Sequence, residues 1–204
     1  MTDIDDRADA AEPVDGRVAR RQRNIDAVLD VVLEMFAEDA MFPTIEQAAT
    51  RSGLSLRSLY RYFADPGELL EATVKRSNQV GRELARLRAI GEGPLEDRIE
   101  DFVAMRLRLH DGIGSVFRAT AANAARHPRI RNELEKNRND MREQFELHVA
   151  PELRRGRRRD RDAVVAAGDL LTQLESIEFL RRHRQLSVAE TRAALTTSLR
   201  ALLG

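Results

Sequence analysis

The sequence predicts an all-α protein, and three observations lead to that prediction. Aromatic residues make up only 4% of the chain and Trp is absent, while Ala, Leu, Arg and Glu dominate, which leaves little material for a β-sandwich or a barrel. Apolar residues recur at three-and-four spacing over long stretches, as they do on the buried face of a helix. Helix-capping residues, Gly and Pro stand where those stretches break.

The composition also limits the classes of function. Basic and acidic side chains number 34 each, so the net charge of +0 does not by itself indicate nucleic-acid binding. No apolar stretch reaches about 18 residues and the N-terminus is acidic, so we expect no membrane span, no signal peptide and a cytoplasmic location. The chain has no Cys, and its four His stand at no known metal or triad spacing. We therefore expect no metal, no cofactor and no enzymatic activity.

The N-terminal part divides into a tail and a first helix. Residues 1–16 are acidic and nearly free of apolar side chains, a composition that predicts a disordered acidic tail. From about Arg17 to Asp39, apolar residues at helical spacing predict a helix, and Arg17, Arg20, Arg21 and Arg23 cluster near its start. This apolar stripe would be the base on which the next helices pack.

Residues 44–63 have the spacing of a helix-turn-helix. Thr44 is a helix cap, and Gly53 permits the left-handed backbone that ends a helix. Leu54 is expected between the two helices, and Ser55 is a second cap for the amides of Arg57 and Ser58. Together these residues predict two short helices joined by a tight turn.

The second of these helices has two different faces. Leu59 and Phe63, four residues apart, are predicted to point inward. The remaining sides carry hydrogen-bond donors and flat rings suited to a DNA groove and its phosphates: Arg57, Ser58, Tyr60, Arg61 and Tyr62. The pattern is that of a DNA-reading helix.

The run GLSLRSLYRYF followed by ADPGELLEA, behind a helix that ends near Phe36, resembles the DNA-binding domain of the TetR family of transcriptional regulators over roughly residues 17–80. The resemblance implies a helix-turn-helix domain at 17–64, a connecting helix and linker at 65–93, and a C-terminal ligand-binding and dimerisation domain at 94–204. It further implies a ligand-responsive repressor that binds a pseudo-palindromic operator as a homodimer. The chain departs from the family pattern at Gly67, where a phosphate-binding Lys is common, and at Ala48, where a larger aliphatic residue is usual.

Seven residues are predicted to contact DNA: Thr44, Ser55, Arg57, Ser58, Tyr60, Arg61 and Tyr62. Arg57 could bind guanine O6 and N7 or a phosphate, and the two alternatives carry equal weight. Of the two tyrosines, Tyr60, next to the inward Leu59, is expected to contact the core as well as DNA.

The rest of the chain should be helical. Asp65, Pro66 and Glu68 form a helix start of the capping-box type, and the following pattern predicts a helix to about Arg88. Further helices are predicted at 94–110, 115–126, 128–149, 161–183 and 187–203, the last with a capping box of Ser187 and Glu190. The apolar stripes of the final pair, which include Leu170, Leu174, Ile177, Val188, Leu195 and Leu199, could pair with a second copy or complete the core of one chain.

Eight residues of the second domain are candidates for an effector pocket, mainly because the resemblance implies one: Phe102, Arg106, His110, Phe117, Met141, Phe145, His148 and Glu178. For each of them an ordinary core or surface position is the alternative. The basic run at 154–161 is expected to be a solvated loop, although a second nucleic-acid surface is the other interpretation.

Two rival functions follow from other classes. One is a DNA-binding architectural or partner-binding protein without a small-molecule ligand. The other is an enzyme with an accessory DNA-binding domain, and no nucleotide, metal or nucleophile motif supports it.

Overall fold

The computed structural model describes residues 14–39, 43–155 and 158–204, and these residues form helices and no strand. The helices are α1 Val14–Asp39, α2 Ile45–Ser52, α3 Leu56–Tyr62, α4 Pro66–Leu84, α5 Leu95–Asn123, α6 Pro128–His148, α7 Ala150–Arg155, α8 Arg158–Thr172, α9 Leu174–Glu178, the π-helix η1 Phe179–His183, and α10 Val188–Leu203. The all-α prediction is confirmed for this part of the chain. None of these helices is long and apolar enough to cross a membrane.

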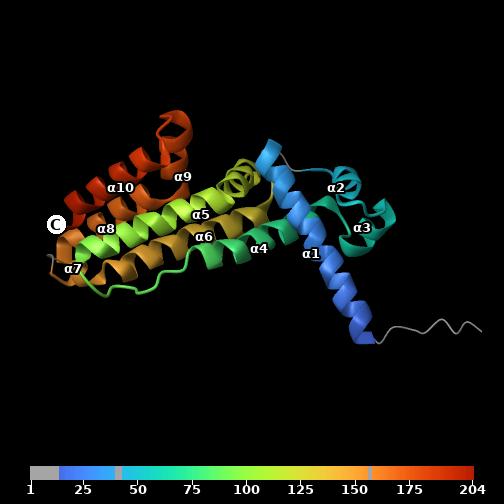
Figure 1. The fold of residues 1–204 in the computed structure, drawn as a ribbon, viewed down its shortest axis with the longest axis horizontal. Coiled ribbons are helices and arrows are strands. Elements are labelled where there is room, and N and C mark those ends of the chain that lie inside the picture. The colour runs from blue at the N-terminus through green and yellow to red at the C-terminus, as the bar shows by residue number, and fades with distance from the viewer. Residues whose placement is uncertain (1–13, 40–42, 156–157) are drawn as a thin grey trace, which may run out of the picture.

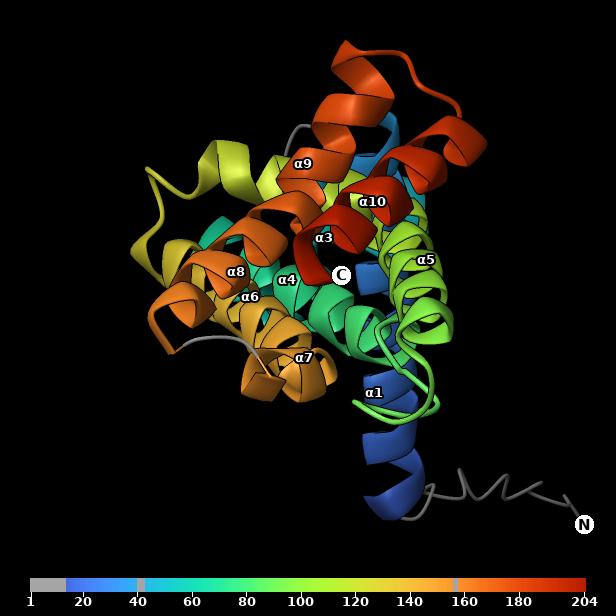
Figure 2. The ribbon, with the colours of Figure 1, turned by 90° about the vertical axis from the view of Figure 1, so that its left-hand side faces the viewer.

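The helices form an elongated body with α2 and α3 at one end (Figure 1). α4, α5 and α6 run along the body, and α8 and α10 cover it on the side away from α1 (Figures 1 and 2). α7 and the C-terminus lie at the end opposite α2 and α3. The DNA-reading candidate α3 and the C-terminal helices are thus at different ends of the molecule.

One hydrophobic core joins α1 to α4 and extends into the second domain. Its members from α1 to α4 are Val28, Leu29, Val32, Phe36, Ile45, Ala48, Ala49, Leu59, Phe63, Leu69, Leu70 and Val74. Val116 and Ala119 of α5 and Ile130 of α6 belong to the same cluster. The helix-turn-helix unit is therefore joined to α5 and α6 through the core that it shares with α1 and α4.

The start of α1 and the end of α4 differ from their predicted positions. α1 begins at Val14, so residues 14–16, which the composition predicts to be tail, are helical. Residues 1–13, which hold the rest of the predicted tail, lie outside the described residues. α4 ends at Leu84, four residues before the predicted end, and residues 85–94 connect it to α5.

The prediction of separate helices at 94–110 and 115–126 is wrong. α5 runs continuously through Gly112 and Gly114. A Cβ on Gly112 would lie 2.3 Å from Leu84 Cδ1, and Gly81 of α4 likewise approaches the Ile113 side chain closely. Gly81 and Gly112 sit where α4 and α5 come together, so they serve packing, and neither Gly112 nor Gly114 ends α5.

The region 150–186 is more irregular than predicted. α7 was not foreseen, and the predicted loop at 154–161 is helical at 154–155 and 158–161, while residues 156–157 lie outside the described part. The predicted helix 161–183 is interrupted at Gln173, whose backbone is extended (φ −67°, ψ 152°). The chain then continues as the short α9 and the π-helix η1.

Candidate nucleic-acid interface and effector pocket

The local sequence fixes the helix-turn-helix as predicted. Thr44 Oγ1 accepts from the Gln47 amide at 3.2 Å, and Gln47 Oε1 accepts from the Thr44 amide at 2.8 Å, which completes a capping box. Gly53 ends α2 with φ 71°. Ser55 Oγ accepts from the Ser58 amide at 3.2 Å and begins α3. Since these bonds connect residues three apart, the local sequence determines where α2 and α3 begin.

α3 has the two faces that the sequence predicted. Leu59 is fully buried and Phe63 is 3% exposed. Arg57 and Arg61, four residues apart, lie on one exposed side of the helix, and Ser58 is partly exposed beside them. The side of α3 away from the core therefore presents two guanidinium groups to an approaching duplex.

The roles of the two tyrosines are exchanged relative to the prediction. Tyr60 is 47% exposed, and its hydroxyl lies 3.4 Å from Glu46 Oε1. Tyr62 is the partly buried one and packs against the core of α1 to α4. Its ring lies between two cations, with Arg21 Cζ 5.7 Å and Arg61 Cζ 5.4 Å from the ring centre. The prediction placed Tyr60 at the core because Leu59 is its chain neighbour, but adjacent residues of a helix point about 100° apart.

The start of α4, next to α3 in the chain, is capped by acids. Asp65 Oδ1 accepts from the Glu68 amide at 2.8 Å, and Glu68 Oε2 accepts from the Ala64 amide at 2.5 Å. Gly67, at the second position of the helix, is exposed and brings no cation. Two carboxylates at this helix end repel a phosphate, so α4 is a poor anchor for a DNA backbone.

In the second domain, a cavity of about 270 Å³ lies between α5 and the segment α9–η1. Three of the predicted effector residues, His110, Phe117 and Glu178, line it. Gly114, Arg118, Ala121, Leu174, Glu175, Phe179 and His183 complete the wall. The cavity thus has apolar surfaces and one polar cluster, as expected of a site for an amphipathic small molecule.

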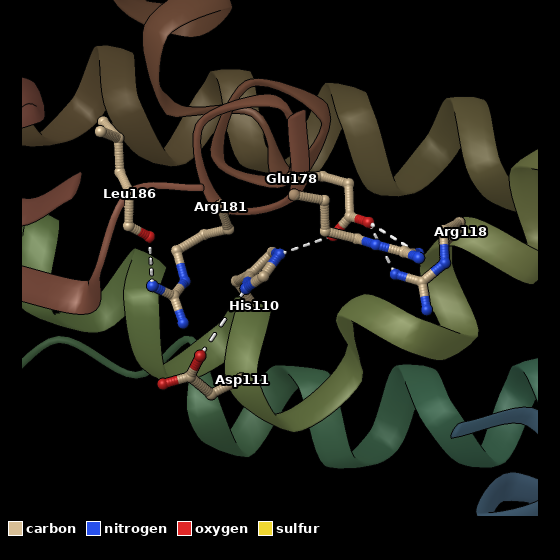
Figure 3. Close-up of polar contacts among 7 residues, drawn as sticks. His110, Asp111, Arg118, Glu178, Arg181 and Leu186 are labelled. Atoms are coloured by element: carbon tan, nitrogen blue, oxygen red, sulfur yellow. Dashed lines mark hydrogen bonds and ion pairs between the residues drawn. The ribbon is translucent and has the colours of Figure 1, made fainter. Parts of the chain in front are cut away.

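Glu178 is the centre of the polar cluster (Figure 3). His110 Nε2 lies 2.9 Å from Glu178 Oε2, and Arg118 Nη1 donates to Glu178 Oε1 at 2.7 Å. Burial disfavours the charged form of Glu178, but the hydrogen bonds from His110 and Arg118 outweigh that effect and hold the pKa of Glu178 below its ordinary value. The cluster therefore connects α5 to α9 through an ionised carboxylate.

The other predicted effector residues do not line this cavity. Phe102, Phe145 and His148 pack on one another, with Phe102 stacked on His148 at 5.2 Å and edge-on to Phe145 at 5.7 Å, around a gap of only about 10 Å³. Met141 is buried in the cluster that also holds Phe117 and Leu174.

Arg106 is fully buried. Its guanidinium donates to Gln144 Oε1 and to the Met141 carbonyl, both at 2.8 Å, and lies over the Phe102 ring. Burial lowers the pKa of Arg106 to about 9, although the negative charge of Asp169 acts in the opposite direction. Sequence spacing identified these residues as inward-facing, but spacing cannot separate a cavity wall from a filled core.

Comparison with known proteins supports the helix-turn-helix directly. The HTH-type transcriptional regulators BetI of Escherichia coli O139:H28 (strain E24377A / ETEC) and of strain K12 / DH10B are each 38% identical to this chain over 86 residues, which is 41% of this chain and 43% of the relative. The matched part of this chain is therefore similar to a stretch of known HTH-type transcriptional regulators. The match spans less than half of the length of these relatives, and no protein-family model matches the chain.

The fold as a whole has a solved counterpart. The fatty acid degradation regulator FadR from Bacillus halodurans superposes with a TM-score of 0.53 and 15% identity, and the match covers 91% of this chain and 95% of that one. At this identity the likeness concerns the fold alone. It supports the arrangement of a helix-turn-helix followed by a helical second domain.

Proposed function

We propose that this protein is a cytoplasmic, DNA-binding transcriptional regulator, most simply a repressor, that binds a pseudo-palindromic operator as a homodimer and responds to a small molecule. The capped α2–Gly53–α3 unit carries the proposal, because it presents Arg57 and Arg61 on the exposed side of a helix whose other side is locked into the core. The regulator relatives share this N-terminal part. A single reading helix contacts few base pairs, so a symmetric pair gains both affinity and specificity.

The geometry of α5 supports ligand response. Val116 and Ala119 of this helix belong to the core of the helix-turn-helix unit, while Phe117 and Ala121 line the cavity. By helical periodicity the two pairs lie on nearly opposite sides of one helix, within about a turn and a half. A molecule that fills the cavity would displace or rotate α5, and α1 and α4 would follow. The ligand would lower DNA affinity by no more than its preference for the displaced form.

Selection of bound duplexes from a random DNA library tests the DNA-binding part. With the purified chain we expect an inverted-repeat consensus. Arg57→Ala should relax the preference at one position by about 1 to 3 kcal/mol, whereas Arg61→Ala should weaken binding to all sequences more evenly. If Arg57→Ala loses the same affinity on every DNA sequence, Arg57 binds a phosphate and does not read a base. Recovery of no motif and no binding at low salt would refute the proposed function.

A thermal-shift screen with a panel of amphipathic metabolites tests the ligand-responsive part. A compound that binds the folded chain raises its melting temperature by mass action. The same compound should lose its effect in Ala121→Phe, which fills the cavity, and should release the selected operator from the wild-type protein. If no compound from a broad panel shifts the melting temperature, the alternative of a DNA-binding architectural or partner-binding protein is favoured.

A further inference from the structure

The first turns of α1 extend past the other helices in both views (Figures 1 and 2). Arg17, Arg20, Arg21 and Arg23 are all exposed there, and Val18 is 63% exposed. The buried positions of α1 begin only at Val28. Packing within the chain therefore does not explain why α1 extends N-terminal of its buried positions.

Three of the four arginines share one side of α1. Arg17, Arg20, Arg21 and Asn24 are separated by three or four residues, which places them together on a helix. Arg23 follows Arg20 by three residues and Arg21 by two, so it lies at the edge of this side, next to Arg20 and away from Arg21. The same helix therefore carries a cationic side that Arg23 borders.

Tyr62 shows which way the cationic side faces. Asn24 Nδ2 donates to the Tyr62 hydroxyl at 3.4 Å, and Arg21 and Arg61 lie beside the Tyr62 ring at 5.7 and 5.4 Å from its centre. Arg61 belongs to the exposed side of α3. The cations of α1 and α3 therefore form one surface, with Tyr62 between them.

Asp26, Asp30 and Glu38 of α1 do not interrupt this surface. Asp30 is bound by Arg76 Nε at 2.9 Å, and Glu38 by Arg51 at 2.8 Å, both toward other helices. Asp26 follows Asn24 by two residues and so points about 200° away. On the other flank of α3, the start of α4 carries the capping carboxylates of Asp65 and Glu68 and no cation. Near α3, attraction for a polyanion is therefore greatest on the α1 side.

We propose that Arg17, Arg20 and Arg21 bind the phosphates of the DNA segment that flanks the base pairs read by α3, on the same duplex. This inference rests on the proposed function. Guanidinium groups bind phosphate oxygens through a planar fork, and each phosphate that a cation neutralises adds about 0.9 to the slope of log K against log salt concentration. The contacts add affinity without sequence information, because the backbone is the same at every position.

The test compares the full-length wild type with the double variant Arg17→Ala/Arg20→Ala. The matched control is Arg154→Ala/Arg155→Ala, which removes two exposed arginines of α7 at the end opposite α2 and α3 (Figure 1). Arg21 is left in place because it lies beside the Tyr62 ring, and circular dichroism checks the helix content of each variant. Affinity for the selected operator is measured between about 50 and 200 mM salt, the range over which phosphate contacts change affinity most visibly. The double variant Arg17→Ala/Arg20→Ala should lose about 0.9 of the slope of log K against log salt concentration per lost phosphate contact and keep the wild-type base preference, while the control should keep the wild-type slope.

A second measurement uses operator DNA trimmed to the selected base pairs. Trimming should reduce the slope of log K against log salt concentration more for the wild type than for the double variant, which has only the Arg21 contact left to lose. An unchanged slope for the double variant on the long operator, or an equal loss for Arg154→Ala/Arg155→Ala, would overturn the inference while leaving the proposed function intact. Failure of the wild type to bind any duplex would overturn both.

Discussion

At the scale of single residues, Arg98 and His148 join three segments of the second domain. Arg98, in the first turn of α5, donates to the His148 carbonyl at 2.6 Å and to the Gly93 carbonyl at 3.2 Å, and forms a buried ion pair with Glu152. The His148 ring is stacked on Phe102, and its Nε2–H donates to the Arg98 carbonyl at 3.0 Å. The linker before α5 and the C-terminal end of α6 are thus held by one set of polar contacts.

Burial, the largest effect, lowers the pKa of His148 below its ordinary value. The unfolded chain therefore binds a proton at a higher pH than the folded chain, so the stability due to the neutral ring is complete above about pH 6.5 and is lost as the pH falls toward the folded value. Urea unfolding of the wild type should show a lower midpoint at pH 5.5 than at pH 7.5. His148→Gln should narrow that difference, and His183→Gln, which removes an exposed histidine, is the control. If the difference between the urea midpoints at pH 5.5 and pH 7.5 is unchanged in His148→Gln, His148 is not the cause of that difference.

At the scale of helices, glycines set how closely neighbours approach. Gly168 of α8 faces the ring of Phe145 so closely that a Cβ would lie 1.9 Å from Phe145 Cζ. Phe145 is 1% exposed and packed against Phe102, so the ring has little room to move. The contact between α6 and α8 therefore requires a residue without a side chain at position 168.

Gly168→Ala should destabilise the protein, although alanine favours a helix by roughly 0.5 to 1 kcal/mol over glycine. The added methyl overfills a packed core, which costs about 1 to 3 kcal/mol and exceeds the helix gain. Chemical denaturation measures the net loss. The double variant Gly168→Ala/Phe145→Leu should lose less stability than the two single variants together, because the smaller side chain leaves space for the methyl. Additive losses would show that the ring is not the obstacle.

At the scale of the whole molecule, the final helices contain both a core and an open surface. Leu174 and Ile177 are buried within the chain, as are Leu195 and Leu199. Leu170 of α8, by contrast, is 68% exposed on the same predicted stripe. The buried leucines and Ile177 thus complete the core of one chain, while the exposed Leu170 is free of that core. The proposed dimer would use the exposed residues of the stripe.

If two copies pair through α8 and α10, Leu170→Glu should disrupt the dimer. Burial of a leucine contributes about 1.5 to 3 kcal/mol, and a two-fold axis counts each change twice, so the dimer dissociation constant should rise at least about 100-fold. Leu147→Glu, at an α6 leucine that is 52% exposed, is the matched control. Sedimentation equilibrium of both variants checks this. A monomeric wild type, or equal weakening by both substitutions, would place the interface elsewhere.

The predictions that held depend on nearby residues. The caps at Thr44, Ser55, Asp65 and Ser187 and the turn at Gly53 all form as predicted, because each depends on hydrogen bonds or backbone angles within three or four residues. The inward Leu59 and Phe63 follow from helix periodicity in the same way. The predictions that failed at Gly112 and Gln173 concern sites where distant segments meet: Gly112 faces Leu84, and Gln173 Nε2 donates to the Arg138 carbonyl at 3.3 Å. The prediction for Tyr60 failed because it relied on chain adjacency and not on helix periodicity.

The sequence by itself determined a helical chain, a capped helix-turn-helix and the side of α3 that faces outward, since local hydrogen bonding and periodicity suffice for these. Only the tertiary structure decided that α5 is one helix, because Leu84 lies against Gly112. It also decided that His110, Phe117 and Glu178 line the cavity while Phe102 and Phe145 fill a core, and that Arg21 lies beside Tyr62. These outcomes depend on which residues far apart in the chain come into contact, and a helical repeat of about 3.6 residues gives the direction of a side chain but not its partner.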